Sequence, residues 1–360
     1  MYRCCGLVLA LIGLPLAAQS MAGGGASGLV WPSEGEYAGS KQCAICHPAL
    51  ARSYHGNSMF RALEPIESCE ILRQNPKLEW TDGRYSYVIE KSAKGFRYQV
   101  TDGKETAETL LRWAFGQGKA GQTYVFERDG RYFESRVSYY QQLNGLGLTV
   151  GALNEKPASL VQALGRSMGD IEARDCFGCH TTGARRGNAL HLDKYEDGVQ
   201  CESCHGPGAA HVASISDGKP KPGTIRSLKG LNAEETSDLC GACHRTWETV
   251  ILMKIRGTNN VRFQPYRMTN SSCFLSGDPR IACTACHNPH GALVHDAGSY
   301  DAKCAACHNR TNAAIQKQIC PVGKQDCVSC HMPRYEVPGS NHAFADHWIR
   351  VARNGEPYPN

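Results

Sequence analysis

Seven copies of the pentapeptide Cys-x-x-Cys-His stand out in this sequence of 360 residues. The copies are Cys43/Cys46/His47, Cys176/Cys179/His180, Cys201/Cys204/His205, Cys240/Cys243/His244, Cys283/Cys286/His287, Cys304/Cys307/His308 and Cys327/Cys330/His331. Two thiols three residues apart can add to the two vinyl groups of one porphyrin, and the next imidazole can bind the iron from one side. The motifs therefore predict seven covalently attached c-type haems, each with the motif histidine as proximal iron ligand.

A structural zinc site is the alternative explanation for paired cysteines. Such a site takes four Cys or His ligands, so two pairs would have to combine. The pairs here are odd in number, and a histidine follows each of them. Both facts favour haem over zinc.

Seven further histidines are candidates for the second, distal iron ligands. They are His55, His191, His211, His290, His295, His342 and His347. His55 follows His47 by eight residues, about 12 Å along a helix, and His290 follows His287 by only three. Such pairs do not easily reach opposite faces of one porphyrin. We therefore expect His55 and His290 to bind a haem other than the one attached just before them.

The remaining distal candidates differ in how far the sequence defines them. His211 follows a tight turn after the third motif, so the same cross-ligation is expected for it. His342 and His347 are five residues apart and could serve separate irons or leave one histidine free. For His191 and His295, ligation and a merely solvated side chain both remain open.

Three cysteines lie outside the motifs and beyond the first residues. They are Cys69, Cys273 and Cys320. In an exported protein the default for such cysteines is a disulfide. The pair Cys273–Cys320 is favoured because both lie in the haem-dense half, which leaves Cys69 as the odd thiol.

The first 22 residues have the pattern of a secretory signal peptide. Arg3 precedes an apolar stretch, residues 6–18, and Ala22 ends a plausible cleavage site. Export fits haem attachment, so we expect a periplasmic or extracellular protein. No later segment is long and apolar enough to cross a bilayer, which predicts no membrane span after signal cleavage.

The formal net charge of +5 does not indicate a nucleic-acid partner. No basic run with interleaved aromatic residues is present. Each oxidised haem adds about one net negative charge through its propionates, which brings the holoprotein to roughly −2. The basic residues are therefore interpreted as counter-ions for propionates.

The long gap between the first and second motifs differs in character from the rest of the chain. It holds three Asp-Gly turn signals, at positions 82, 102 and 129, and alternating apolar and polar runs around them. We therefore expect an α+β protein with an antiparallel β-rich insert, 78–141. A haem-1 segment, 23–77, precedes the insert, and a six-haem region, 142–360, follows it. In the six-haem region the porphyrins would form the core, wrapped by short helices and loops.

Residues 116–121 of the insert match the dinucleotide fingerprint G-x-G-x-x-G. That motif requires a helix to follow, so that the phosphates meet its N-terminus. The residues that follow, Thr123 to Phe126, instead have the pattern of a strand. A glycine-rich loop is the preferred interpretation.

Several of these segments together resemble the cytochrome c-552/4 family. Cys43–His47 with His55 is similar to the opening of such a domain, and Gly198–Gly208 with His211 to a segment common in multihaem cytochromes. Cys283–Gly291 and Cys327–Pro333 fit the same family. The resemblance implies kinship with the tetrahaem electron carrier of nitrifying bacteria and, more distantly, with hydroxylamine oxidoreductase and multihaem nitrite reductases. It also implies that His55, His211 and His290 act as distal ligands. The chain departs from the family in having seven motifs rather than four, and it lacks the Cys-x-x-Cys-Lys signature of pentahaem nitrite reductases.

These observations predict a heptahaem electron-transfer protein that relays electrons between donor and acceptor proteins through mostly bis-histidine haems. Two alternatives remain. The first is a multihaem oxidoreductase that acts on a small nitrogen or sulfur species at one open haem. The second is a homo-oligomer, a protomer of an extracellular cytochrome filament in which a C-terminal histidine such as His342 or His347 binds a haem of the next subunit. No catalytic residue is assigned.

Overall fold

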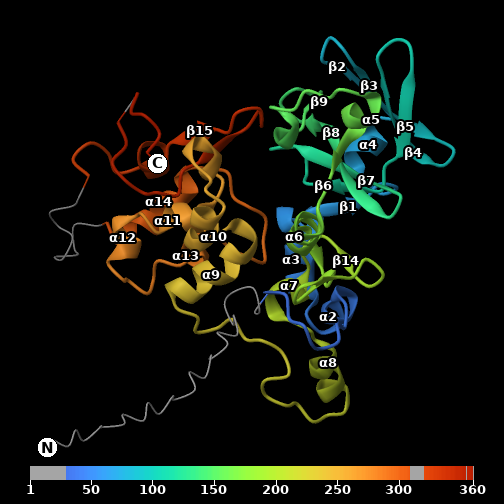
Figure 1. Cartoon of the computed structure of the whole chain (residues 1–360). Coiled ribbons are helices and arrows are strands. Elements are labelled where there is room, and N and C mark those ends of the chain that lie inside the picture. Colours follow the sequence, from blue (N-terminus) through green and yellow to red (C-terminus); the bar gives the residue numbers. More distant parts are fainter. Residues whose placement is uncertain (1–29, 309–319, 354, 360) are drawn as a thin grey trace, which may run out of the picture.

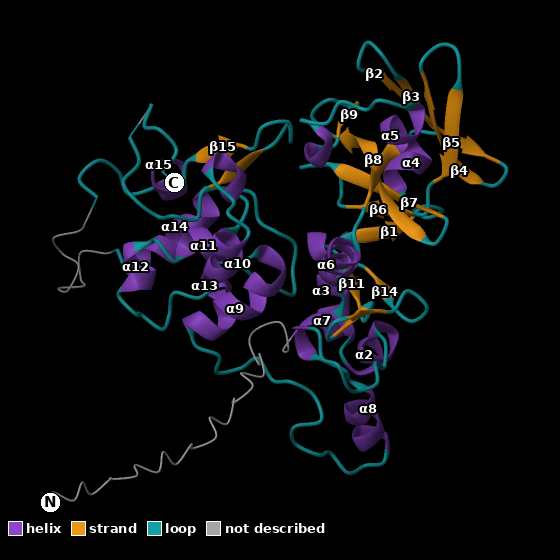
Figure 2. Ribbon diagram, viewed as in Figure 1, coloured by secondary structure: helices purple, strands orange, loops and turns teal. Residues whose placement is uncertain are grey.

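The computed structural model describes residues 30–308, 320–353 and 355–359 and has an α+β fold. Figure 1 shows β-sheets grouped at one end, above the helices α2, α3, α6 and α7. The helices α9 to α14 form a second group beside them (Figures 1 and 2). The predicted signal peptide, 1–22, lies outside the described residues.

The first sheet is a four-stranded antiparallel meander in the order β2-β3-β4-β5. Its strands are β2 (Lys77–Thr81), β3 (Ser86–Ser92), β4 (Gly95–Thr101) and β5 (Thr106–Leu110). Gly83 and Gly103 adopt positive φ at the β2–β3 and β4–β5 turns, a conformation that costs glycine little. Two of the Asp-Gly turns expected from the sequence are thereby confirmed.

The second sheet has six strands, in the order β1-β6-β7-β8-β10 with β9 paired to β8. The strands are β1 (Leu63–Pro65), β6 (Trp113–Phe115), β7 (Gln122–Arg128), β8 (Arg131–Tyr140), β9 (Gly145–Leu148) and β10 (Gly165–Ser167). The third Asp-Gly turn, at Asp129, joins β7 to β8. Strands β1, β9 and β10 lie outside the insert predicted at 78–141, so the β-rich part extends beyond it on both sides. These three strands were not predicted because they are too short to show an alternating pattern in the sequence.

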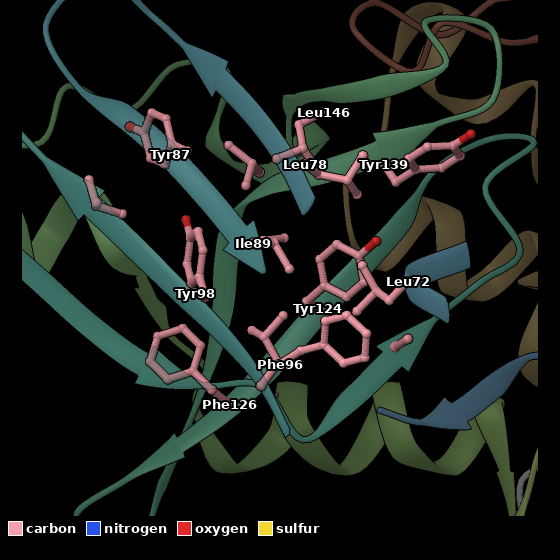
Figure 3. Packing of buried hydrophobic residues seen from close by; sticks show 14 of the residues in the cluster. Leu72, Leu78, Tyr87, Ile89, Phe96, Tyr98, Tyr124, Phe126, Tyr139 and Leu146 are labelled. Atoms are coloured by element: carbon pink, nitrogen blue, oxygen red, sulfur yellow. The ribbon is translucent and has the colours of Figure 1, made fainter. Parts of the chain in front are cut away.

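Aromatic and aliphatic side chains from both sheets form one core (Figure 3). Tyr87, Tyr98, Tyr124 and Ile89 of the strands are fully buried in it. Leu72 of helix α4 (Glu70–Gln74) is buried in the same core. Full burial of an aliphatic or aromatic side chain of this size contributes about 1.5–3 kcal/mol. The β-rich part therefore has a side-chain core of its own.

The glycine-rich segment 116–121 is a loop between β6 and β7. Gly116, Gly118 and Gly121 have positive φ, and strand β7 follows. The Gln122 side chain donates to the Gly116 carbonyl oxygen at 2.9 Å and closes the loop. The interpretation as a glycine-rich loop, without the helix that a dinucleotide site needs, is confirmed.

The rest of the chain is made of short helices and loops. The helices that carry motif residues are α2 (Ser40–Cys46), α6 (Asp170–His180), α7 (Cys201–His205), α9 (Ala233–His244), α13 (Cys283–Cys286), α14 (Gly298–Ala305) and α15 (Cys327–His331). The helices between them include α3 (Pro48–Tyr54), α8 (Ala209–Ser216), α10 (Trp247–Leu252), α11 (Gln264–Met268) and α12 (Ser272–Leu275). Among the described residues, no helix has the length and apolar character to span a membrane.

The helical part has a small side-chain core. In the described chain from residue 207 onward, the buried hydrophobic residues are Leu239, Val250, Val261, Tyr266 and Val337. A segment of this length needs far more apolar burial to offset its conformational entropy. A large apolar filling other than side chains fits this composition.

Candidate haem-binding sites

The motif cysteines lie on short helices or close to their ends. In α7, for example, Cys201, Cys204 and His205 belong to one helical turn and a half. Helical residues at i, i+3 and i+4 lie on one face, so both thiols and the imidazole can face the same ligand. This geometry is what two thioether bonds and one iron bond to a single haem require.

Two residues predicted to bind haem, Cys307 and His308, differ from this arrangement. Helix α14 ends at Ala305, so Cys307 and His308 lie beyond it, and their amides donate to the Cys304 carbonyl oxygen at 3.2 and 2.8 Å. His308 and Cys330 are exposed, as are Cys46, His47 and Cys286 of other motifs. Helices α14 and α15 are short and contact each other. The attachment of haem at these residues stays a prediction.

The described part of the chain contains no group of three or more His, Cys, Asp or Glu side chains arranged to hold a metal ion. A structural zinc site needs four such ligands around one point. Among the described residues, the motif cysteines of different helices are thus not grouped as such a site requires, and a haem at each motif stays a prediction.

Three proximal histidines have one ring nitrogen bound to a backbone carbonyl. Nδ1 lies 2.8 Å from the Ala62 oxygen in His180, 3.1 Å from the Arg226 oxygen in His205 and 2.9 Å from the Arg350 oxygen in His331. A hydrogen bond donated by Nδ1 fixes the tautomer whose Nε2 carries a free lone pair. These imidazoles are therefore prepared to bind iron through Nε2.

His290 lies opposite the proximal His205. The two ring centroids are 6.1 Å apart and the rings are nearly parallel, at 7°. With metal–imidazole bonds of about 2.0 Å and about 1.1 Å from ring nitrogen to ring centre, two axial ligands of one metal have centres about 6.2 Å apart. The pair thus fits the two faces of the third haem, although His290 follows the fifth motif.

His347 stands in the same relation to His287, the proximal histidine of the fifth motif. Their ring centroids are 6.2 Å apart at an interplanar angle of 35°. The Nδ1 of His347 lies 3.1 Å from the Ala345 carbonyl oxygen, so Nε2 again is free. Burial lowers the pKa of His347 to about 4, which keeps the imidazole neutral.

Three distal candidates contact side chains other than a proximal histidine. The His55 ring lies 4.2 Å from the Phe60 ring, and the His342 ring 4.7 Å from Phe344. His295 Nε2 is 3.1 Å from Lys119 Nζ, at the glycine-rich loop. The other two candidates lie on different elements: His211 on α8, and His191 directly after strand β13 (Ala189–Leu190).

The disulfide expected between Cys273 and Cys320 is not formed, because both are free thiols. Cys273 belongs to α12 and is half-buried, whereas Cys320 is exposed and accepts a hydrogen bond from the Gly323 amide. Cys69 is buried in the β core, and its thiol donates a hydrogen bond to Gln122 Oε1 at 3.1 Å. The position of Cys273 and Cys320 in the same half of the sequence was therefore not sufficient to predict a disulfide between them.

The motif helices contact one another in succession. The contacts are α2 with α7, α6 with α9, α9 with α13, α13 with α14, and α14 with α15. Four thiol pairs from different motifs are hydrogen-bonded neighbours: Cys43 and Cys201, Cys179 and Cys243, Cys240 and Cys283, and Cys304 and Cys327.

The segment after the second motif joins this succession to the third. Thr182 follows α6 and its hydroxyl lies 2.6 Å from that of Ser203, between the third-motif cysteines. Helix contacts and side-chain contacts therefore arrange the motifs in the order 1-3-2-4-5-6-7.

Half-buried arginines lie in the motif-bearing part of the chain. The Nε atoms of Arg262 and Arg174 are buried and have no hydrogen-bond partner among the described residues, although Arg174 Nη1 donates to the Asn188 carbonyl oxygen at 3.1 Å. Burial lowers the pKa of Arg262, with a further contribution from Arg245. Guanidinium groups removed from water normally have anionic partners, and a haem propionate would be such a partner for Arg262.

Sequence reasoning missed three groups that position the ligand segments. Fully buried Glu202 accepts hydrogen bonds from the Ala38, Gly39 and Gly208 amides at 2.6–2.8 Å. Asn57 donates to the carbonyls beside His290, and Asp346 precedes His347 in a buried ion pair. An acidic residue inside the third motif was the one visible signal; the other two depend on long-range contacts.

Comparison with known proteins gives two similarities. Residues 152–206, which include the second and third motifs, match the family described as cytochrome c554 and c-prime. The chain is also 26% identical over 153 residues to the multiheme cytochrome MtrA of Shewanella baltica (strain OS185). The aligned residues cover 37% of this chain and 42% of that protein. No solved structure matches the chain.

The chain thus spans less than half the length of the relative that it matches. Both similarities concern c-type cytochromes, and the attachment motifs and facing imidazoles fit covalent haem. The chain is therefore similar to multihaem c-type cytochromes over part of its length.

Proposed function

We propose that this chain is an exported heptahaem cytochrome that relays electrons between redox partner proteins. The observation that carries the proposal is the succession of contacts that joins the motifs from α2 to α15, with the hydrogen bond between Thr182 and Ser203 as the link between the second and third motifs. The likeness to multihaem cytochromes supports electron transfer as the general activity. The relay, the number of seven haems and the periplasmic or extracellular location are our own inferences.

Each bound haem would supply a one-electron ferric/ferrous couple. The cysteine pairs would hold each group by two covalent bonds, and the proximal histidines would offer Nε2 to the iron. His290 and His347 would serve as the second ligands of the third and fifth haems. Burial and the nearby arginines set the local charge and so tune each potential.

Cross-ligation has a structural consequence. His290 follows the fifth motif but faces the third, so it ties the α13 segment to α7. This tie supplements the contact between α6 and α9, which also joins the two helical groups of Figure 1. Two links between the groups keep neighbouring haems at fixed separations, as rapid electron exchange requires.

A multihaem oxidoreductase with one open haem is the second candidate. The contact between His295 and Lys119 favours it, because a histidine whose Nε2 faces a lysine ammonium does not at the same time bind iron. With His295 engaged in this way, fewer histidines than haems remain to serve as distal ligands. The filament protomer is less favoured, since His347 faces a proximal histidine of its own chain.

Low-temperature electron paramagnetic resonance (EPR) of the oxidised holoprotein, calibrated against its haem content by mass spectrometry, tests the proposal. Low-spin ferric signals that account for seven haems would support the carrier. A high-spin signal equal to one haem would favour the enzyme, with nitrite and hydroxylamine as the first substrates to try. A haem content well below seven would contradict the proposal.

A further inference from the structure

One short segment of the chain holds the axial ligands of two different haems. In residues 345–350, the Ala345 carbonyl oxygen lies 3.1 Å from Nδ1 of His347, which faces His287 of the fifth motif. The Arg350 carbonyl oxygen lies 2.9 Å from Nδ1 of His331, the proximal histidine of the seventh motif. The backbone of this segment therefore orients one imidazole at each of two sites.

The segment is fixed by a fully buried ion pair. Arg267 of α11 and Asp346 are each 0% exposed and form a bidentate contact, with Nε to Oδ1 at 2.8 Å and Nη2 to Oδ2 at 2.9 Å. Arg350 Nη1 lies 2.9 Å from the same Oδ2. Asp346 also accepts a hydrogen bond from the Trp348 amide at 3.0 Å. One carboxylate therefore binds two guanidinium groups and a backbone amide of its own segment.

Other contacts hold the same backbone in place. Ser271 donates its hydroxyl to the His347 carbonyl oxygen at 3.0 Å and accepts from the Ile349 amide at 2.8 Å. The Asp346 amide donates to the Pro333 carbonyl oxygen at 2.9 Å. The segment is therefore bound both to the α11–α12 region and to the chain after the seventh motif.

We propose that Asp346, with Arg267 and Arg350, is a positioning group that sets both the geometry and the redox potential of the haems at the fifth and seventh motifs. The proposal rests on the proposed ligation of iron by His347. Two arginines share the Asp346 carboxylate one residue from a proposed iron ligand, and Glu356 Oε1 lies 4.0 Å from Arg350 Nε at the outer side of the cluster. Desolvated charge at such a site acts strongly on the iron, because little water screens it.

The sign of each effect follows from the charge of the iron, which is one unit more positive when oxidised. Asp346→Asn removes a negative charge and leaves two buried guanidinium groups, so it disfavours the oxidised state and raises the midpoint potential. Arg350→Gln removes a positive charge and keeps the Arg267–Asp346 pair, so it lowers the potential. A clamp with only a structural role would not shift the potential in opposite directions in the two variants.

Spectroelectrochemical titration of the full-length holoprotein tests the proposal, with Glu90→Gln as control. Glu90 pairs with Arg97 on the β2–β5 sheet, whose strands carry no motif residue, so this variant should leave every potential unchanged. We expect an upward shift in Asp346→Asn and a downward shift in Arg350→Gln, confined to at most two of the seven haems. Shifts of the same sign in both variants, or spread over all the haems, would overturn the proposal.

His347→Ala separates a failure of this proposal from a failure of the underlying ligation. If His347 binds iron, this variant gains one high-spin haem and identifies the signal of the fifth haem. If all haems stay low-spin, the ligation is wrong and the proposal falls with it. Should Asp346→Asn fail to fold, Tyr335→Phe, which removes a 2.9 Å contact to Arg350 Nη2 and leaves every charge, provides the comparison for Arg350→Gln. A potential unchanged in Arg350→Gln would then overturn the proposal.

Discussion

His205 and His290 lie with their rings parallel and their centroids 6.1 Å apart, although they come from different motifs and different helical groups. His205 belongs to the helix of the third motif, whereas His290 follows the fifth. One haem iron between the two imidazoles would therefore join segments that are distant in the sequence. His290 follows His287 by only three positions, so it does not easily reach the opposite face of the haem attached at its own motif.

Replacement of His290 by alanine should free one iron. We expect His290→Ala to convert one low-spin ferric signal into a high-spin signal of one haem equivalent in the EPR spectrum. His295→Ala is the informative comparison, because its Nε2 faces Lys119. A His290 variant in which every haem stays low-spin would refute the proposed pairing.

Asn57 holds the backbone on both sides of His290. Its amide donates to the Pro289 carbonyl oxygen at 3.1 Å and to that of Gly291 at 2.8 Å. Asn57→Ala should cost about 1–3 kcal/mol in the free energy of unfolding and loosen the ligand loop. We expect the reduced variant to bind carbon monoxide at one haem faster than the wild type does, as measured by flash photolysis.

Asn75→Ala is the matched control for Asn57→Ala. Asn75 donates a similar 2.9 Å hydrogen bond to the Ile71 carbonyl oxygen of α4, within the β-rich part. Loss of this bond should leave carbon monoxide binding unchanged. Equal effects of the two variants would mean that Asn57 has no specific role at His290.

Glu202 should be a determinant of stability at the junction of the first and third motifs. Its buried carboxylate accepts three backbone N–H bonds, and two of these come from the residues just before α2. Glu202→Gln replaces one acceptor oxygen by a donor, so at least one amide loses its partner. We expect a loss of about 1–3 kcal/mol in urea unfolding of the holoprotein. Glu79→Gln, at an exposed pair with Lys77, should change stability by less than about 0.5 kcal/mol.

Removal of haem should affect the two parts of the chain differently. The β-rich part has its own core around Tyr98 and Tyr124, whereas the described chain from residue 207 onward buries few apolar side chains. In protein produced without haem attachment, hydrogen exchange should therefore remain slow in strands β3, β4 and β7 and become fast in α9 and α13. Uniformly fast exchange would show that the sheets also depend on haem.

The sequence alone determined the haem-attachment chemistry, because Cys-x-x-Cys-His needs only local spacing to place two thiols and an imidazole together. It also determined the main hairpins, since an Asp-Gly pair encodes its turn locally. Strands β1, β9 and β10 could not be predicted, because their pairing depends on partners far along the chain.

Only the tertiary structure decided which histidine faces which motif. His290 and His347 reach their partners through long-range packing, and no spacing rule distinguishes them from His295 or His342. The same holds for the free thiols of Cys273 and Cys320 and for the pair of Arg267 with Asp346. Neighbouring residues determine local geometry such as a turn or a Cys-x-x-Cys-His motif. A site formed by distant segments depends on tertiary packing, so the sequence pattern does not predict it.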